Sequence, residues 1–105
     1  MSGRERLPNR RNSESFEFEC NGIPYGCTYS QFADGRLAEV FVESTKSGSA
    51  ADITSRDAAI ACSFALQHGA EADLVRRALC RDIHGNALGP LATALDRIVG
   101  LVVVK

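Results

Sequence analysis

The sequence predicts one α+β domain, in which a three-stranded antiparallel meander is followed by three helices packed on one face of the sheet. Two short turn signals, Asn21-Gly22 and Asp34-Gly35, divide an alternating apolar pattern into three strands. Three segments with helical spacing of apolar residues come after them, near 49–68, 71–80 and 90–99. We expect residues 15–105 to form this domain and residues 1–14 to form a flexible basic tail.

The composition is that of a small globular protein, and it argues against nucleic acid and membranes as partners. The 105 residues carry a net charge of −1, which gives no overall attraction to nucleic acid or to an anionic membrane. No apolar run approaches the roughly 18 residues that a membrane span needs. Residues 1–14 hold four arginines but lack the apolar region of a secretion signal. We therefore expect a cytoplasmic protein with no membrane or nucleic-acid partner.

No two of the four cysteines are spaced as a C-x-x-C pair; they are Cys20, Cys27, Cys62 and Cys80. Neither a zinc ribbon nor a dithiol redox pair has their spacing. Free cysteines in a reducing compartment behave as small buried apolar residues. We therefore expect four structural thiols, no metal site and no cofactor.

Apolar residues alternate with glutamates over residues 16–20, as they do in a strand with one buried face. Two-residue turns at Asn21-Gly22 and Asp34-Gly35 would fix the register of all three strands. Both turns then place one set of side chains on a common core face: Phe16, Phe18, Cys20, Ile23, Tyr25, Cys27, Tyr29, Val40 and Val42. The opposite face collects Phe32, Leu37 and Phe41. This second group is a candidate interaction surface, with local shielding of the sheet as the alternative.

The central helix is expected between a cap at Ser49 and a stop at Gly69. Asp52 completes a capping-box pattern with Ser49, and Thr54 or Ser55 is a rival start. Apolar residues cover most of its girth, and its polar stripe consists of Arg56, Ser63 and Gln67. A helix of this kind packs on more than one side, so we expect it to be the buried centre of the domain.

The same helix carries Asp57, Cys62 and His68, which are residue types found in catalytic dyads and metal sites. Asp57 and His68 lie about 16 Å apart along the helix axis, too far to hydrogen-bond as a dyad. Cys62 has no neighbouring base or cation in the sequence to activate it as a nucleophile. We expect Asp57 and His68 to complement the helix dipole near its two ends, and we assign no catalytic residue.

Two loops remain as candidate sites. The loop before the central helix could hold a phosphate through backbone N–H groups, although it lacks the full Walker spacing. Its alternative role is that of a linker and helix cap. The second loop holds Asp82 and His84, which are too few to define a site. The first loop consists of Lys46, Ser47, Gly48 and Ser49.

A resemblance to a known domain is carried by residues 32–79, FADGRLAEVFVESTKSGSAADITSRDAAIACSFALQHGAEADLVRRAL. This run resembles the TSCPD domain, a small domain at the C-terminal side of adenosylcobalamin-dependent (class II) ribonucleotide reductases. The matching features are the DGRLAEVFV strand, the KSGS linker, Asp57, and the later SFALQHG and LVRRAL segments. The resemblance extends over roughly 25–98 and implies a free-standing relative of that domain.

The resemblance does not bring catalytic residues with it. The catalytic machinery of the parent enzymes lies in a large barrel, which a chain of this length cannot contain. The Thr-Ser-Cys-Pro-Asp string that names the domain is also missing, and Leu88-Gly89-Pro90-Leu91-Ala92 stands in its place. The resemblance therefore implies neither a thiol nor a metal role for this segment.

Three functions follow as expectations. The first is a non-catalytic accessory or interaction module in deoxyribonucleotide synthesis, which binds a ribonucleotide reductase subunit or a second copy of itself. The second is a small nucleotide- or anion-binding protein that uses the loop Lys46–Ser49, with Arg76 or Arg77 as a further contact. The third is a ribonucleoside-diphosphate reductase component that is active only with a catalytic partner. The tail LVVVK, residues 101–105, is a strand, a frayed helix end or an association surface.

Overall fold

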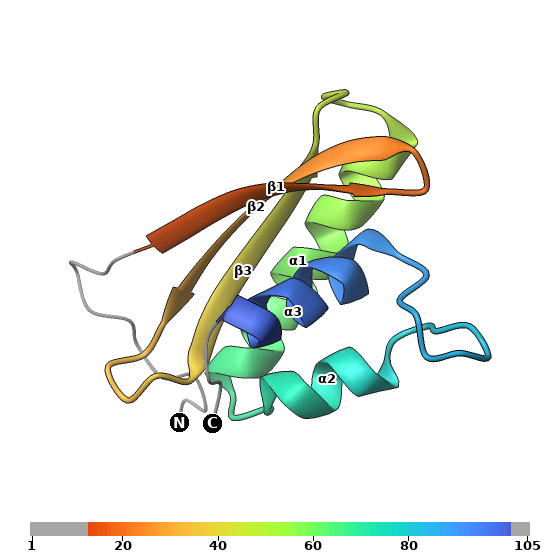
Figure 1. Cartoon of the computed structure of the whole chain (residues 1–105). Coiled ribbons are helices and arrows are strands. Elements are labelled where there is room, and N and C mark those ends of the chain that lie inside the picture. The colour runs from red at the N-terminus through yellow and green to blue at the C-terminus, as the bar shows by residue number, and fades with distance from the viewer. Residues whose placement is uncertain (1–12, 102–105) are drawn as a thin grey trace.

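The structure is a computed structural model that describes residues 13–101, and it confirms the α+β fold class (Figure 1). Its strands are β1 (Ser13–Cys20), β2 (Ile23–Gln31) and β3 (Leu37–Ser44). Its helices are α1 (Ala50–Gln67), α2 (Ala72–Ala78) and α3 (Pro90–Leu101). Strand β1 begins at Ser13, so the sheet includes the last two residues of the expected tail. Residues 1–12, and residues 102–105 of the LVVVK segment, lie outside the described residues.

The sheet is the expected antiparallel meander, with the strand order β1-β2-β3. At the first turn Asn21 and Gly22 have φ angles of 54° and 78°, as a two-residue hairpin loop requires. This turn pairs Cys20 with Ile23, which confirms the predicted register of the first hairpin.

The second turn is one residue longer than predicted. The N–H of Phe32 donates to the C=O of Arg36 at 2.8 Å, which encloses a loop of three residues, 33–35. Gly35 has a φ of 96°, the positive value that this loop type demands at its last position. A β-bulge then leaves Ala38 without a partner on β2 and restores the predicted register for the rest of β3.

The bulge corrects the predicted interaction surface. Leu37 pairs with Gln31 rather than with Phe32, so its side chain lies on the core face and is 3% exposed. Phe32 is buried as well, and the guanidinium carbon of Arg36 lies 4.6 Å from the centre of its ring. Of the three residues predicted to form this surface, only Phe41 is exposed.

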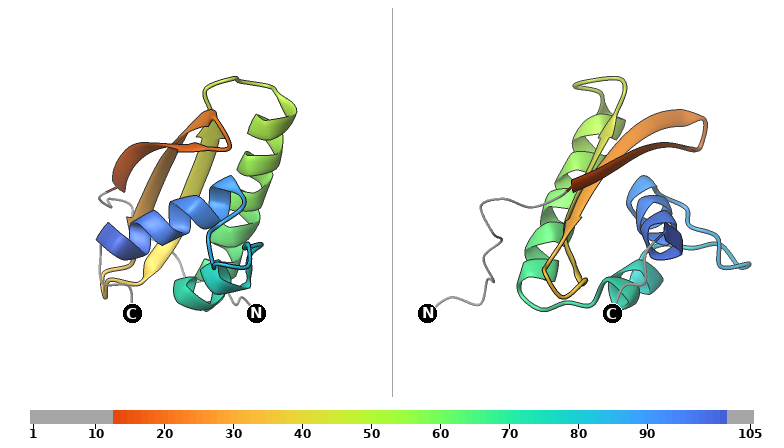
Figure 2. Two further views of the ribbon diagram at one scale, coloured as in Figure 1. Left: turned by 45° about the vertical axis from the view of Figure 1, so that its right-hand side comes forward. Right: turned by 60° about the vertical axis from the view of Figure 1, so that its left-hand side comes forward.

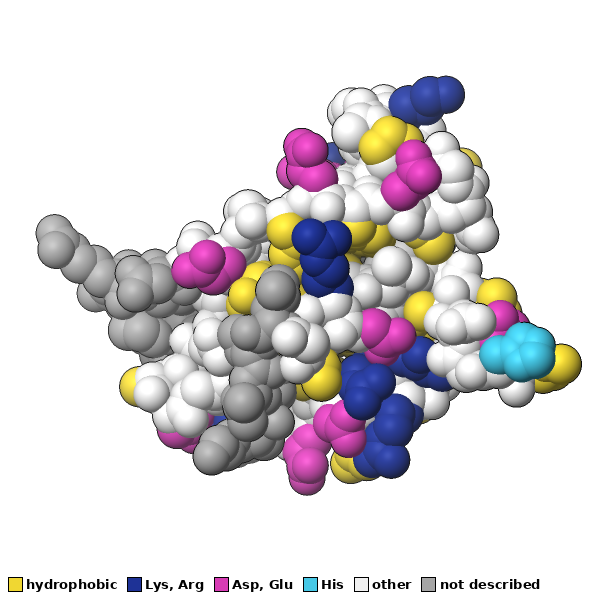
Figure 3. Space-filling model, in the orientation of Figure 1, with side chains coloured by type: hydrophobic (Ala, Val, Ile, Leu, Met, Phe, Trp, Pro, Cys, Tyr) yellow, Lys and Arg dark blue, Asp and Glu magenta, His cyan; other side chains and the backbone are white. Residues whose placement is uncertain are grey.

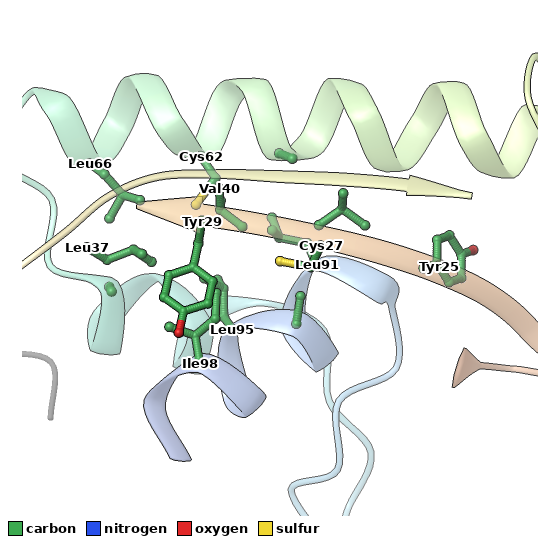
Figure 4. Packing of buried hydrophobic residues seen from close by; sticks show 14 of the residues in the cluster. Tyr25, Cys27, Tyr29, Leu37, Val40, Cys62, Leu66, Leu91, Leu95 and Ile98 are labelled. Atoms are coloured by element: carbon green, nitrogen blue, oxygen red, sulfur yellow. The ribbon is translucent and has the colours of Figure 1, made fainter. Parts of the chain in front are cut away.

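The core lies between the face of the sheet that curves over α3, helix α3 itself, and one side of α1 (Figures 2 and 4). Helix α3 crosses this face, whereas α1 runs alongside β3. The core cluster contains Cys20, Tyr25, Cys27, Tyr29, Leu37, Val40, Val42, Ala59, Cys62, Leu66, Ala72, Leu91, Ala94, Leu95 and Ile98. The core face that the two turns predicted is therefore confirmed for β2 and for Val40 and Val42 of β3.

The ends of α1 agree with the sequence signals. The Oγ of Ser49 accepts a hydrogen bond from the N–H of Asp52 at 3.1 Å and caps the first turn. His68 is the C-cap, and Gly69 follows it with a φ of 103°. Helix α3 ends at Leu101, two residues beyond the end predicted for it. None of the described helices has the length and apolar character that a bilayer span requires.

Candidate functional site

Helix α1 covers the free edge of β3 with polar side chains. The Oγ of Ser63 accepts a hydrogen bond from the N–H of Val40 at 2.9 Å and donates one to its C=O at 2.8 Å. One turn later, the Nε2 of Gln67 donates to the C=O of Ala38 at 3.2 Å. Backbone groups that would otherwise be free at a sheet edge are thus bonded by a helix, which occupies the place of a fourth strand (Figure 1).

The fit between helix and strand follows from their repeat lengths. Four helical residues rise about 6.0 Å, and two strand residues span about 6.6–6.8 Å. Side chains four residues apart on α1 therefore stay beside alternate residues of β3. Gln67 and Ser63 occupy successive places in this row. By the same spacing, the next place on α1 falls to Ala59, opposite Val42, and its methyl group cannot form a hydrogen bond.

Beyond Ala59, the carboxylate of Asp52 closes the seam between α1 and β3. Its Oδ1 accepts from the N–H of Ser44 at 3.0 Å, and its Oδ2 accepts from the N–H of Gly48 at 2.9 Å. These two bonds, that from Gly48 first, hold the pKa of Asp52 below its ordinary value although the residue is only 1% exposed. A more distant ion pair, 3.6 Å from Arg56, acts in the same direction.

The predicted anion-binding loop is therefore engaged with a carboxylate of the chain itself. The N–H of Gly48 bonds Asp52, and the N–H of Ser49 bonds the C=O of Lys46 at 3.2 Å. Lys46 and Ser47 are exposed. The arrangement matches the alternative expectation for this loop, a linker and helix cap.

The burial of α1 differs from the prediction at two polar and three apolar side chains. Ser63 and Gln67, from the predicted polar stripe, are 6% and 2% exposed because they face the edge of β3. The apolar side chains of Ile53, Ile60 and Phe64 are 52%, 46% and 49% exposed. Phe41 of β3 is 46% exposed. We call Phe41, Ile53, Ile60 and Phe64 the apolar strip.

A groove of about 310 Å³ lies where the apolar strip meets the edge of β3. It is lined by Phe41, Val42, Glu43, Arg56 and Ile60. The side chain of Val42 points into the core and the residue is 1% exposed. The main chain of Val42 therefore forms its part of the groove wall.

The arginines of α2, expected as further nucleotide contacts, are paired with carboxylates. Arg76 lies 2.8 Å from Asp73 and 3.2 Å from Asp96, and Arg77 lies 3.1 Å from Asp73. Arg81 donates to both carboxylate oxygens of Asp96, at 2.7 and 2.9 Å, and lowers the pKa of that carboxyl. Figure 3 shows side chains of both charges side by side over α2. This cluster ties α2 to α3.

Asp82 and His84 do not combine into a site. The Oδ1 of Asp82 accepts from the N–H of Asn86 at 2.9 Å and from the N–H of His84 at 2.8 Å. The bond from Asn86 is the first cause that lowers the pKa of Asp82. The carboxylate therefore shapes its own loop, and the side chain of His84 is exposed.

The structure also separates Asp57, Cys62 and His68. Asp57 is exposed, Cys62 is buried, and the Nδ1 of His68 lies 2.9 Å from the C=O of Phe64 at the end of α1. Burial raises the pKa of Cys62 to about 11 and that of Cys27 to about 12, so both remain neutral thiols near pH 7. Over residues 13–101, no three His, Cys, Asp or Glu side chains are grouped as metal ligands would be.

Neither the groove nor the apolar strip was predicted from the sequence, because the polar side chains of α1 were expected to be exposed and its apolar side chains to be buried. A signal was present in the repeat of small and polar residues Ser55, Ala59, Ser63 and Gln67, spaced four apart. Such a row lets a backbone approach closely and offers it hydrogen bonds.

Comparison with known proteins gives partial matches to one kind of enzyme. A vitamin B12-dependent ribonucleotide reductase of Agrobacterium fabrum is 36% identical over 66 residues, which make up 63% of this chain and 5% of that enzyme. A vitamin B12-dependent ribonucleotide reductase of Bradyrhizobium diazoefficiens is 33% identical over 73 residues, 70% of this chain and 6% of that enzyme. No family model and no solved structure matches the chain. The resemblance to a small domain of class II reductases is confirmed, and the chain spans about one twentieth of the length of these relatives.

Proposed function

We propose that this relative of a short segment of vitamin B12-dependent ribonucleotide reductases is a non-catalytic accessory module of deoxyribonucleotide synthesis in the cytoplasm. It would act by docking on a partner protein, with a ribonucleotide reductase subunit as the expected partner. The contact surface is the apolar strip, which replaces the surface expected from Phe32, Leu37 and Phe41.

The observation that carries this proposal is the exposure of the apolar strip. Ile53, Ile60 and Phe64 recur at positions that share one side of α1, and Phe41 adjoins Ile60 across the groove. Large apolar side chains gathered on one face typify protein interaction sites, whereas single exposed ones are ordinary. Aromatic residues on such a face supply much of the binding energy of an interface.

The polar hydrogen bonds between α1 and β3 also support docking through the apolar strip. Helix α1 is fixed to β3 by Ser63, Gln67 and Asp52, and its side that carries the apolar strip takes no part in these bonds. That side is therefore held in one orientation but left open to a partner. A preorganised surface loses less conformational entropy on binding than a mobile one does.

The test measures binding to a purified vitamin B12-dependent ribonucleotide reductase by biolayer interferometry. Ile60→Asp places a charge at the centre of the apolar strip and should weaken binding at least tenfold. Leu74→Asp, at a side chain that is 54% exposed on α2, is the matched control and should bind like the original chain. Absence of binding by the original chain, or equal losses in both variants, would refute this function.

Self-association is the alternative use of the same surface. Sedimentation of the chain alone, over a range of concentrations, separates the two cases. A dimer that Ile60→Asp dissociates and Leu74→Asp leaves intact would assign the apolar strip to a second copy rather than to a reductase.

A further inference from the structure

The two edges of the sheet differ in what covers them. The outer edge of β3 is covered by α1, whose Ser63, Gln67 and Asp52 bond its backbone. Strand β1 forms the other border of the sheet (Figure 2), and within residues 13–101 it pairs with β2 alone. An uncovered strand edge presents a row of N–H and C=O groups with which a further strand can pair.

Pro24 identifies the residues of β1 whose backbone groups point outward. Antiparallel pairs alternate between residues that exchange both N–H···O=C bonds with each other and residues whose groups point away from each other. Glu19 pairs with Pro24, which has no N–H, and the C=O of Pro24 accepts from Thr45, which follows β3. The backbone groups of Glu19 therefore point away from β2. By alternation, those of Glu17 and Ser15 point the same way.

A hydrogen bond from α3 agrees with this direction. The Nη1 of Arg97 donates to the C=O of Glu17 at 3.3 Å, and its guanidinium carbon lies 4.8 Å from the centre of the Phe16 ring. No residue among 13–101 bonds the N–H of Ser15, Glu17 or Glu19, and these three residues are exposed. The edge of β1 therefore offers open donors and acceptors. The one bonded carbonyl has a long bond to a side chain, which an incoming N–H can replace.

The side chains of β1 define the chemistry of a strand that can pair with this edge. Glu17 and Glu19 are exposed on the face of the sheet opposite the core. Phe16 and Phe18 lie on the core face and are partly buried against the core cluster. A neighbouring strand would place its side chains alternately beside the glutamates and beside the phenylalanines. Basic residues suit the first set of places, and apolar residues suit the second.

We propose that the edge of β1 binds an extended segment of a partner protein in which basic residues alternate with apolar ones. The segment pairs antiparallel to β1 as a fourth strand of the sheet, and its backbone bonds Ser15, Glu17 and Glu19. Its basic side chains lie directly opposite Glu17 and Glu19, a place in which opposite charges stabilise strand pairing. A second copy of β1 would bring further glutamates to this edge, so the charges favour a basic partner over self-pairing.

This site is separate from the docking surface of the proposed function. The apolar strip belongs to α1 and β3, and β2 lies between β3 and the edge of β1. The test below needs only the isolated chain and synthetic peptides. A chain that binds the peptides but no reductase would refute the proposed function alone, and the reverse result would refute this inference alone.

The experiment titrates the isotope-labelled chain with synthetic peptides to millimolar concentrations and follows the backbone amide signals by NMR. Each peptide has eight residues, the length of β1. Lysine alternates with valine in the first peptide, and glutamate replaces every lysine in the second. We expect saturable binding of the lysine peptide, at least tenfold tighter than binding of the glutamate peptide. Absence of saturable binding, or equal binding of the two peptides, would overturn the proposal.

Two further forms of the lysine peptide test the backbone pairing itself. One carries N-methyl groups on its lysines and the other carries them on its valines. In the antiparallel pair, the lysines opposite Glu17 and Glu19 donate to β1, whereas the N–H groups of the valines point away from it. Methylation of the lysines should therefore abolish binding, and methylation of the valines should leave it in place. Equal binding by the two methylated peptides would contradict strand pairing.

Amide hydrogen exchange locates the bound strand on β1. The N–H groups of Ser15, Glu17 and Glu19 gain acceptors in the complex and should exchange at least tenfold more slowly. Those of Phe16 and Phe18 already point toward β2 and should change little. Binding through charge attraction alone would leave exchange at all five positions unchanged, which would also refute the proposal.

Ser15→Pro removes an outward N–H and leaves the bonds between β1 and β2 in place, a position at which edge strands tolerate proline. It should weaken binding of the lysine peptide at least tenfold. Ser15→Ala is the matched control, because it loses only the hydroxyl, which lies 3.0 Å from that of Thr28, and it should bind normally. Equal binding by the two variants would count against the proposal. The methylated peptides test the same bonds if Ser15→Pro does not fold.

The charge of the partner is tested by the double variant Glu17→Lys/Glu19→Lys, which should prefer the glutamate peptide. Glu43→Lys changes an exposed glutamate of β3 and should keep the preference for the lysine peptide. An unchanged preference in the double variant would refute a basic partner. A dimer of the original chain alone that Ser15→Pro dissociates would assign the edge to a second copy and would likewise overturn the proposal.

Discussion

The hydroxyl of Ser63 lies between the two backbone groups of Val40, accepting from its N–H and donating to its C=O. A serine on a helix thereby completes the hydrogen bonding of a strand. Both residues are buried, so neither water nor another strand serves these groups. The contact between α1 and β3 consequently depends on individual side-chain polar atoms such as the Oγ of Ser63, in addition to apolar packing.

Ser63→Ala should destabilise the fold by about 1–3 kcal/mol, because it leaves a buried donor and acceptor unpaired. Urea unfolding followed by circular dichroism measures the change. Thr54→Ala, on the exposed side of the same helix, should stay within about 0.5 kcal/mol of the original chain. Equal stability of the Ser63→Ala variant and the original chain would show that the seam contributes little.

Asp52→Asn should lower stability in a pH-dependent way. The pKa of Asp52 is lowered in the folded state, so its contribution is present above the unfolded pKa of about 3.9 and is lost as pH falls through the lower folded value. The difference in urea midpoint between the variant and the original chain should therefore be wide near pH 7 and narrow below about pH 4. A constant difference across that range would contradict the assignment.

The four cysteines should differ sharply in reactivity. Cys80 is exposed, whereas Cys20, Cys27 and Cys62 are buried. Burial alone raises the pKa of Cys27 to about 12 and that of Cys62 to about 11, which keeps the reactive thiolate scarce. Iodoacetamide at pH 8 should label only Cys80 in the native chain and all four in guanidinium chloride, as mass spectrometry would report.

The three-residue turn gives a matched pair of glycine substitutions. Gly35→Ala should cost about 1–2 kcal/mol, because an alanine at a φ of 96° is strained even where space is open. Gly26→Ala, in the middle of β2, has open space around its added methyl group and no positive φ. It should leave stability unchanged or raise it slightly. Thermal unfolding of both variants distinguishes turn strain from a general effect of removing glycine.

Sequence patterns sufficed wherever a local rule decided the structure. The Asn21-Gly22 turn, the Ser49 cap and the Gly69 stop each depend on neighbours along the chain, and each is found as predicted. The core face of β2 followed because its register was set by such a turn.

The remaining structure depended on contacts that no local rule contains. Asp34-Gly35 is compatible with loops of two or three residues, and the choice reverses the face of Leu37. The burial of Ser63 could not be read from its polarity, because its partner Val40 lies 23 positions away along the chain. The groove followed neither from periodicity nor from the family resemblance, because its lining combines residues of β3 and of α1 that are far apart in the sequence.

The covering of β3 by α1 also limits how copies of this chain could assemble. A three-stranded sheet has two edges, and one of them is already occupied by the helix. Strand pairing between molecules is then restricted to β1, so each molecule offers one sheet edge for pairing. Two copies joined through β1 would form one six-stranded sheet with a helix at either border, and growth would stop there. The hydrogen bonds that fix α1 to β3 thus also prevent the sheet from extending through both of its edges into an open-ended assembly.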